Sequence, residues 1–245
     1  MSLAAKWGVT RSLAIYYGQP WKTARMKRFY AQFVSPGDLC IDVGAHVGNR
    51  VRAWRSLGAK VVAVEPQPMM VSTLERFFGS DPLVEILPIG LADVPGKLTL
   101  HINTRNPTIT SFSQGWVDAF SRIESSPFDD QVDVAVSTLD LLLADRGTPA
   151  FCKIDVEGFE DKVLAGLSTP VPVLSFEAFP LEVERSLVCI DKLMALGEYQ
   201  FRTVQAEQFR WVEPEWMDAD SAKKRLQGWG MGEGSGDVYA RLHSM

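Results

Sequence analysis

The chain has 245 residues, of which 46% are hydrophobic and 22% charged, with a formal net charge of −5 at pH 7. This length suits one large α/β domain with appendages, and nothing in the composition indicates disorder. The acidic balance argues against non-specific nucleic-acid binding as the main activity. Residues 1–37 differ from the remainder because they contain no acidic side chain. Their basic residues are Lys6, Arg11, Lys22, Arg25, Lys27 and Arg28.

The three cysteines, Cys40, Cys152 and Cys189, are unclustered and set in apolar surroundings. This usage indicates reduced thiols in the core of an intracellular protein. No metal-ligand spacing is present. Since the sequence shows neither the apolar core of a signal peptide nor a stretch long enough to span a bilayer, we expect a cytoplasmic protein with no membrane partner.

Apolar periodicity places the elements along the chain. Residues 6–17 and 21–33 have helical spacing and predict a basic N-terminal helical cap over residues 1–35. Short apolar runs predict strands at residues 39–43, 60–64, 84–91, 97–102, 131–136, 150–156, 171–176, 201–204 and 238–242. Helices are expected at residues 47–57, 69–78, 116–123, 137–144, 160–167, 181–196 and 221–227. This alternation implies an α/β fold with a doubly wound, mainly parallel sheet and an antiparallel closing pair.

The first strand runs into a turn with glycines at both ends, Asp42-Val-Gly44-Ala-His46-Val-Gly48-Asn49. Gly44 allows a sharp turn and a close ligand, because it has no Cβ. Gly48 would open the next helix, whose N–H groups favour polar or anionic ligand groups. The dinucleotide fingerprint G-x-G-x-x-G is absent, since His46 occupies the place of its second glycine. The motif alone fits either a plain strand-to-helix turn or a nucleotide-cofactor turn.

Charged residues mark the ends of two further strands. Glu65 closes the second strand about 20 residues after the glycine turn, where an acidic side chain in this class of fold accepts hydrogen bonds from ribose hydroxyls. Lys153, Asp155 and Glu157 alternate along a segment that otherwise has a buried pattern, and they share one side if the strand continues. Ligands in such folds bind beyond the carboxyl ends of the strands.

Two irregular stretches remain. Residues 103–130 form a long loop of the kind that covers a binding site, and we expect it to face the acceptor. Residues 211–236 are an insertion with a glycine-rich end, for which a flexible hairpin loop is favoured over a phosphate cradle. No linker divides the chain, so residues 36–245 are expected to form one cofactor-binding domain.

Three blocks together resemble the FkbM-like S-adenosylmethionine-dependent methyltransferases: the glycine turn, Val64-Glu65-Pro66, and Lys153-Ile-Asp155-Val-Glu157-Gly-Phe-Glu160. The last block is the most specific, and the resemblance covers about residues 36–177. It implies a Rossmann-like class I methyltransferase fold with a seven-stranded sheet, S-adenosyl-L-methionine as cofactor, and methyl transfer to a hydroxyl of a sugar or secondary metabolite.

The resemblance also implies site residues. The methyl donor would be bound by Asp42, Gly44, Gly48, Asn49, Glu65 and Pro66, with Leu91, Ala92 and Asp93 bordering the adenine. Ser111 lies in Thr110-Ser111-Phe112, which is similar to a small-hydroxyl motif of the family but has Thr110 in place of its second serine. Ser111, Glu157 and Glu177 would face the acceptor.

Methyl transfer needs alignment, exclusion of water and removal of one proton. Asp155 is the first choice as general base; Lys153 could tune it, or act itself if burial lowers its pKa. His46 is a second candidate, although it also fits a packed loop histidine. Asp155 and Glu157 could hold a divalent metal, but no third ligand is evident and an ion pair with Lys153 is the simpler interpretation, so no metal is predicted.

Two alternative functions stay open at this point. One is a nicotinamide-dependent oxidoreductase on a Rossmann-like fold, which the absent second glycine disfavours. The other is a non-catalytic methyltransferase-like subunit whose basic N-terminal helices bind a partner. For the leading function we expect a small-molecule acceptor and no nucleic acid. The basic helices suggest an anionic or nucleotide-linked acceptor, or simply complement the acidic remainder, and the sequence does not indicate the oligomeric state.

Overall fold

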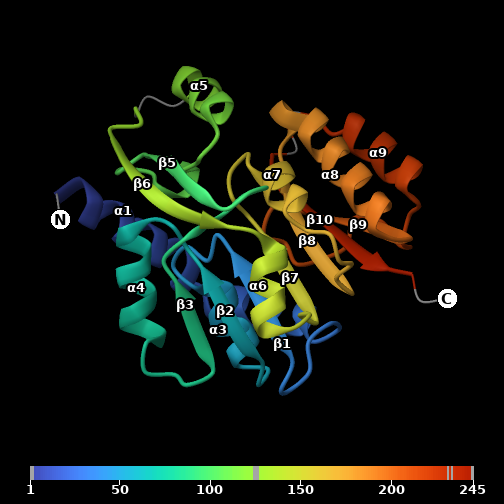
Figure 1. Ribbon diagram of the computed structural model, residues 1–245, viewed down its shortest axis with the longest axis horizontal. Helices are drawn as coiled ribbons and strands as arrows, with labels where there is room; N and C mark the ends of the chain where they lie inside the picture. The colour runs from blue at the N-terminus through green and yellow to red at the C-terminus, as the bar shows by residue number, and fades with distance from the viewer. Residues whose placement is uncertain (1–2, 124–126, 231, 233, 244–245) are drawn as a thin grey trace.

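A computed structural model describes residues 3–123, 127–230, 232 and 234–243 (Figure 1). Its main sheet has seven strands in the order β3-β2-β1-β7-β8-β10-β9. Their bounds are Leu39–Val43 for β1, Lys60–Val64 for β2, Val84–Leu87 for β3, Phe151–Ile154 for β7, Val173–Ala178 for β8, Tyr199–Gln205 for β9 and Gly236–Leu242 for β10. Strand β10 runs antiparallel to both neighbours, and the other adjacent pairs are parallel. The expected seven-stranded sheet with an antiparallel closing strand is confirmed.

Helices cover both faces of this sheet because successive strand residues point to opposite sides. Cys40 packs with Trp54 and Tyr30 on one face, whereas its neighbour Ile41 packs with Leu164 on the other. The first face carries α2 (Pro20–Tyr30), α3 (Asn49–Arg55) and α4 (Pro68–Phe78), and the second carries α6 (Leu139–Arg146), α7 (Glu160–Ala165), α8 (Val183–Leu196) and α9 (Ala219–Gln227).

A second, three-stranded sheet has the order β4-β6-β5 and lies above the main sheet in Figure 1. It consists of β4 (Gly90–Leu91), β5 (Gly96–Ile102) and β6 (Asp130–Ser137). The prediction of one continuous strand over residues 84–91 is therefore wrong. The chain changes sheets at Pro88, which has no N–H to donate to a strand ladder, so β3 pairs with β2 and β4 pairs with β6.

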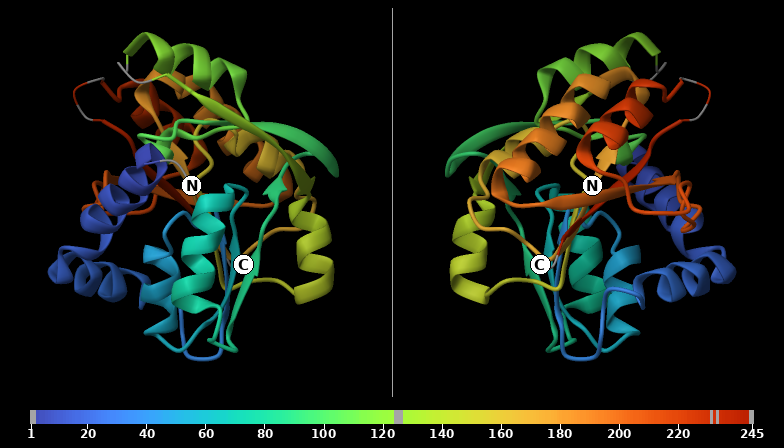
Figure 2. Two further views of the ribbon diagram at one scale, coloured as in Figure 1. Left: turned by 90° about the vertical axis from the view of Figure 1, so that its left-hand side faces the viewer. Right: turned by 90° about the vertical axis from the view of Figure 1, so that its right-hand side faces the viewer.

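The two N-terminal helices pack differently. In α2, Phe29 and Tyr30 are buried in the aromatic core that includes Trp54, whereas Trp21 is 64% exposed. Helix α1 (Leu3–Tyr17) lies at the edge of the molecule beside the loop that follows β1 (Figure 2). The Tyr17 hydroxyl fixes it there by donating to the carbonyl oxygen of Val47 at 2.9 Å.

The remaining irregular segments contain short elements. The predicted acceptor loop holds a 3-10 turn at Pro107–Ile109 and helix α5 (Gln114–Ile123), and a further 3-10 turn occupies Pro180–Glu182. Helix α9 lies inside the predicted insertion 211–236. None of the helices in the described ranges has the length and apolarity needed to cross a membrane.

Candidate active site

One cavity lies where the carboxyl ends of the parallel strands meet. Strand β1 contributes the turn with Gly44, β2 contributes Glu65, and β7 contributes Asp155. Glu177 near the end of β8 and Asp237 at the start of the antiparallel strand β10 also line it. The α1 residue Tyr16 and the loop before α5 complete the walls. This is the position at which such sheets bind ligands.

The Glu65 carboxylate is held by backbone groups. Its Oε2 accepts a hydrogen bond from His46 N at 2.7 Å, and its Oε1 accepts one from Gln67 N at 2.8 Å. The side chain belongs to a residue that is only 5% exposed. Burial raises the pKa of Glu65 to about 7, although the two backbone hydrogen bonds oppose that shift. The Glu65 side chain therefore links the turn after β1 to the end of β2.

The two glycines of the turn have different roles. Gly44 has φ +85°, and a Cβ added there would stand 1.8 Å from the Asp155 carbonyl oxygen, so only glycine lets the two strand ends approach. Gly48 has φ +79° and caps α3, but a Cβ there would meet the Phe78 ring at 2.5 Å. Gly48 therefore packs against α4 and does not line the cavity, although its cofactor role was predicted.

His46 is half-buried beneath α1. Its Nε2 lies 3.4 Å from Ser12 Oγ, and its ring meets Tyr16 edge-on with centroids 5.6 Å apart. Burial lowers the pKa of His46 to about 4. The imidazole is therefore neutral at pH 7 and has little tendency to take a proton, which disfavours its predicted role as a secondary base.

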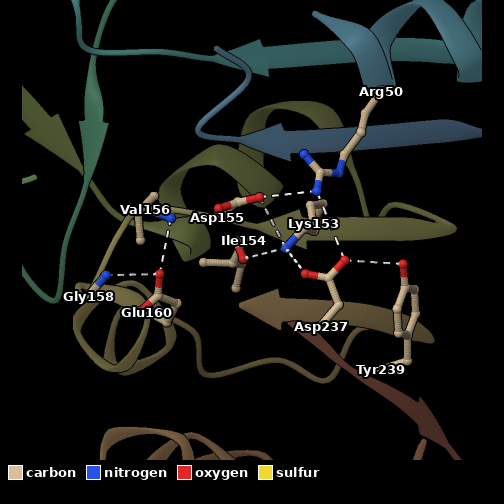
Figure 3. Close-up of polar contacts among 9 residues, drawn as sticks. All are labelled: Arg50, Lys153, Ile154, Asp155, Val156, Gly158, Glu160, Asp237 and Tyr239. Carbon is tan, nitrogen blue, oxygen red and sulfur yellow. Dashed lines mark hydrogen bonds and ion pairs between the residues drawn. The ribbon is translucent and has the colours of Figure 1, made fainter. Parts of the chain in front are cut away.

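A quartet of charged side chains lies at the cavity wall, where Arg50, Asp155 and Asp237 line the cavity and Lys153 is fully buried behind them (Figure 3). Lys153 Nζ is 2.7 Å from Asp237 Oδ1 and 3.4 Å from Asp155 Oδ2. Arg50 from α3 approaches the same carboxylates, at 3.1 Å from Asp155 and 3.9 Å from Asp237. The positive charges of Lys153 and Arg50 thus balance the negative charges of the two aspartates.

Electrostatic interactions within the quartet set the pKa values of Lys153 and Asp155. Burial alone would lower the pKa of Lys153, but the carboxylates of Asp155 and Asp237 outweigh it and raise that pKa. Lys153 therefore stays an ammonium, and the condition under which it was expected to act as a base, a pKa lowered by burial, is not met. Burial likewise opposes ionisation of Asp155, yet Lys153 and Arg50 hold the pKa of that carboxyl below its usual value.

Two further carboxylates join Asp155 at the cavity. One oxygen each of Asp155, Glu157 and Glu177 lie within 4.8 Å of one another, a spacing that suits a cation or shared protons. Glu177, which was predicted to face the acceptor, thus also supplies the third carboxylate beside Asp155 and Glu157 that the search for metal ligands in the sequence did not identify. Burial and then the Glu177 charge raise the pKa of Glu157 well above its usual value. Burial and then Asp155 do the same for the pKa of Glu177.

The turn after β7 is braced by Glu160, to which the sequence assigned no role. Its Oε1 accepts from Val156 N at 3.1 Å and from Gly158 N at 3.3 Å (Figure 3). Between them Glu157 has φ +54°, an uncommon conformation for a residue with a side chain. Because β7 ends at Ile154, the predicted row of charges along one strand face does not form, and this turn places Glu157 instead.

The predicted acceptor loop contacts this turn directly. Ser111 Oγ donates to the Glu157 carbonyl oxygen at 2.6 Å and accepts from Ser113 N at 2.9 Å. Its hydroxyl is therefore engaged within the protein, even though Ser111 lines the cavity together with Phe112. Ser111 tethers the loop to the carboxylate turn.

The remaining predicted residues divide into two groups. Asn49 and Pro66 line the cavity. Leu91, Ala92 and Asp93 do not: Leu91 and Ala92 are buried, and Asp93 is half-exposed with a carboxylate oxygen 3.9 Å from Lys162 Nζ. The structure therefore does not bring these three residues to the cavity.

Sequence reasoning missed Arg50, Gln67, Glu207 and Asp237, all of which line the cavity. Arg50 directly follows the glycine turn, and Gln67 directly follows Val64-Glu65-Pro66. This position next to a recognised motif is the sequence signal that could have identified both residues. Asp237 is 84 residues from its partner Lys153, so no local pattern connects the two.

Several unsatisfied polar groups fit a nucleoside cofactor. Asn49 Nδ2 and Gln67 Nε2 line the cavity, are buried, and have no hydrogen-bond partner in the described part of the chain. Both oxygens of buried Asp42, beneath the glycine turn, also lack a described partner, and burial raises the pKa of this carboxyl to about 6. Buried polar groups are normally paired, so these atoms fit a polar ligand with hydroxyls, amines and a carboxylate. S-adenosylmethionine offers all three.

Comparison with known proteins agrees with this chemistry. The family described as "Methyltransferase FkbM domain" matches residues 42–201. A tRNA U34 carboxymethyltransferase from Cellvibrio japonicus (strain Ueda107) is 36% identical over 66 residues, which are 24% of this chain and 20% of that protein. The chain thus matches only about a fifth of the length of this curated relative.

Solved structures of methyltransferases show a weaker likeness. Precorrin-6y C5,15-methyltransferase from Geobacter metallireducens GS-15 has a TM-score of 0.46 at 10% identity, over 90% of this chain and 87% of that one. A TehB-like SAM-dependent methyltransferase from Corynebacterium glutamicum has a TM-score of 0.46 at 9% identity, over 95% and 100%. The family match is the decisive finding, because it spans more than half of the chain. The protein belongs to the FkbM family of S-adenosylmethionine-dependent methyltransferases.

Proposed function

We propose that this methyltransferase acts on a hydroxyl oxygen of a small molecule, such as a sugar or a secondary metabolite. The observation that carries the proposal is the arrangement of one cavity. Its cofactor end is formed by the Gly44 turn and Glu65, and its other end presents Glu157 and Glu177. One carboxylate oxygen of each glutamate lies within 4.8 Å of one oxygen of Asp155. The cavity thus joins a nucleoside-binding end to proton-accepting groups.

At the cofactor end, the predicted contacts of Glu65, Gly44 and Asn49 have a physical basis. S-adenosylmethionine, when bound, supplies a methyl group activated by its sulfonium. The Glu65 carboxylate, oriented by two backbone N–H groups, would accept hydrogen bonds from the ribose hydroxyls. Gly44 leaves the space beside the strand end open, and Asn49 Nδ2 and Gln67 Nε2 supply unused donors.

At the acceptor end, the protein must take one proton from the hydroxyl as its oxygen forms the new bond to carbon. We assign this proton to the ionised member of the Glu157 and Glu177 pair, because the raised pKa values of the pair give it more proton affinity than Asp155. Asp155 stays ionised between Lys153 and Arg50, and it would orient the acceptor. This assignment replaces the sequence preference for Asp155 as the base.

The side chains that line the cavity favour a neutral or cationic acceptor over a phosphorylated one. The carboxylates that line the cavity are those of Glu65, Asp155, Glu157, Glu177, Glu207 and Asp237. Arg50 is the only Lys or Arg among the residues that line it, and it already contacts Asp155. Because no unpaired cation lines the cavity within the described residues, a phosphate next to the reacting hydroxyl would be desolvated without a counter-charge and would be destabilised. This supports a small hydroxylated acceptor rather than RNA, the substrate class in the name of the curated relative.

The test is transfer of labelled methyl groups from S-adenosylmethionine to a set of free sugars and hydroxylated metabolites, with total tRNA as the competing acceptor. The proposal expects a labelled methyl ether from a member of the first set and none in tRNA. Binding of S-adenosylhomocysteine by calorimetry, with NAD in a parallel titration, separates cofactor use from acceptor choice. Label in tRNA alone, or saturable binding of NAD but not of S-adenosylhomocysteine, would overturn the proposal.

A further inference from the structure

The outward faces of α1 and α2 form a surface unlike the rest of the molecule. Of the tryptophans in the chain, the two that are largely exposed, Trp7 at 68% and Trp21 at 64%, both lie here. Ile15 on α1 is also exposed. Large exposed apolar side chains that gather on one segment mark an interaction site. Both helices lie along one edge of the molecule in each view of Figure 2.

The same surface carries unneutralised positive charge. Arg25, Lys27 and Arg28 on α2 are exposed, and no ion pair links any of them to a described residue. Trp21, Arg25 and Arg28 follow the spacing i, i+4, i+7, which places them on one stripe of the helix. Since no acidic residue occurs before Asp38, nothing within the segment offsets these charges. The chemistry that matches this surface is anionic and has an apolar layer to receive indole rings.

We propose that the α1–α2 surface, defined by Trp7, Ile15, Trp21, Arg25, Lys27 and Arg28, docks the protein on an anionic lipid bilayer. Tryptophan is favoured at the boundary between headgroups and acyl chains, and basic side chains are attracted to anionic headgroups. A helix that lies on the bilayer need not cross it, so the absence of a spanning helix does not oppose this mode. The proposal revises the sequence expectation of no membrane partner.

A bilayer fits better than a nucleic acid, the other common polyanion. With 25 basic and 30 acidic residues in the whole chain, and 6 basic and none acidic in residues 1–37, the remainder has 19 basic and 30 acidic residues, a net charge of −11. A nucleic acid long enough to reach the cavity would cross this acidic remainder, whereas a flat bilayer touches only one face.

The surface is also coupled to the active site through the inner side of α1. Gly8 and Ser12 face inward: a Cβ on Gly8 would meet the Thr104 carbonyl oxygen at 2.6 Å, and Ser12 lies beside His46. Tyr16 from the same helix lines the cavity. A bilayer against the outer side would therefore hold one cavity wall in place and bring the cavity close to the headgroup layer.

The experiment is co-sedimentation of the full chain with vesicles of phosphatidylcholine alone and of equal parts phosphatidylcholine and phosphatidylglycerol. We expect binding to the anionic vesicles only, weakened by salt. R25Q/R28Q removes two charges worth about 1 kcal/mol each near an anionic surface, so partitioning should fall about 30-fold. W7A/W21A should also weaken binding, and K60Q/K97Q, which removes two exposed lysines elsewhere, should leave it unchanged.

Since all substituted side chains are exposed, circular dichroism and S-adenosylhomocysteine binding should match the wild type and show that each variant is folded. The docking proposal would be overturned by equal binding of wild type and R25Q/R28Q, by no sedimentation with anionic vesicles at low salt, or by binding of total tRNA through the same residues. Vesicle binding needs no cofactor or acceptor, so failure here leaves the proposed methyl transfer untouched.

Discussion

Lys153 on β7 reaches across β8 to place its Nζ 2.7 Å from Asp237 Oδ1 on β10. The strand between them carries Ser175 in register with Lys153, and this small side chain leaves room for the long one. The carboxyl end of the parallel sheet is thereby joined to the antiparallel closing strand beneath the candidate active site. The contact is buried, since Lys153 is 0% exposed.

Removing the charge of Asp237 should destabilise the fold. In Asp237→Asn the buried ammonium keeps only Asp155, at 3.4 Å, and Arg50 loses one of its two carboxylates. Breaking a buried pair costs about 3 kcal/mol or more, because the partner charge stays desolvated. The free energy of unfolding from urea titration measures this loss. Asp237→Asn combined with Lys153→Met should recover part of it, and an unfolding free energy equal to that of the wild type would contradict the buried quartet.

The sequence predicts the parts of this molecule that depend on local patterns. Short apolar runs such as Leu39–Val43 placed strands of the main sheet, and the glycine turn with Glu65 located the edge of the sheet at which the cavity lies. Contacts between distant segments leave no such pattern. The pairing of Lys153 with Asp237, and the switch of the chain between sheets at Pro88, depend on which strands become neighbours in space.

Leu91, Ala92 and Asp93 were expected to border the adenine but do not reach the cavity. This difference also arises from pairing between distant segments. Leu91 was expected at the cavity as part of a strand in the main sheet. It belongs instead to β4, which pairs with β6, and its side chain enters the core beside α6. Because residues 84–91 were predicted to form one strand, the strand was expected to end too far along the chain. The loop after residue 91 was therefore wrongly expected at the edge of the cavity.

Glu65→Ala should weaken S-adenosylhomocysteine binding strongly. The substitution removes the acceptor for the His46 and Gln67 backbone N–H groups as well as the proposed ribose contacts. Hydrogen bonds to a charged group contribute about 1.5–3 kcal/mol, so we expect about a hundredfold loss of affinity by calorimetry. Glu184→Ala, which removes an exposed carboxylate on α8, should bind as the wild type does. Unchanged affinity in Glu65→Ala would place the cofactor elsewhere.

Glu160 should act as a positioning residue for the acceptor end. Glu160→Ala leaves the N–H groups of Val156 and Gly158 without their acceptor and releases the turn in which Glu157 has φ +54°. We expect loss of turnover by about tenfold or more with S-adenosylhomocysteine binding retained, from about 1–3 kcal/mol for unsatisfied backbone groups. Glu160→Gln keeps an acceptor oxygen and should restore most of the turnover. Equal loss in both variants would show that charge, not the brace, matters.

The stability of the ligand-free protein should fall as pH rises from about 6.5 to 8. The pKa values of Glu65 and Glu160 are raised by burial to about 7 in the folded chain, so the folded state holds protons that the unfolded chain has lost. Their contribution is present at low pH and is lost as pH rises through 7. The pKa of His46 is lowered to about 4 in the folded chain, so this residue makes stability rise with pH instead. It does so only below pH 6.5, the pKa of His46 in the unfolded chain.

Urea titrations across this range measure the slope, and Glu160→Gln should flatten it because the amide does not titrate. Asp155 does not contribute, since its pKa lies below the window in both states. A stability that rises between pH 6.5 and 8 would contradict the burial of these protonated acids.

The last prediction separates Asp155 from the glutamates in catalysis. If the Glu157 and Glu177 pair takes the acceptor proton, Glu177→Gln should lower turnover by 10²–10⁴-fold, the range of general-base catalysis, while S-adenosylhomocysteine binding is kept. Its residual rate should also lose the rise with pH that reports deprotonation of the pair. Asp155→Asn removes the anion between Lys153 and Arg50, at 3.4 and 3.1 Å, so it should weaken acceptor binding and stability but keep the pH-dependent rise. If Asp155→Asn abolishes that rise and Glu177→Gln preserves it, the base is Asp155, as its place at the end of β7 first indicated.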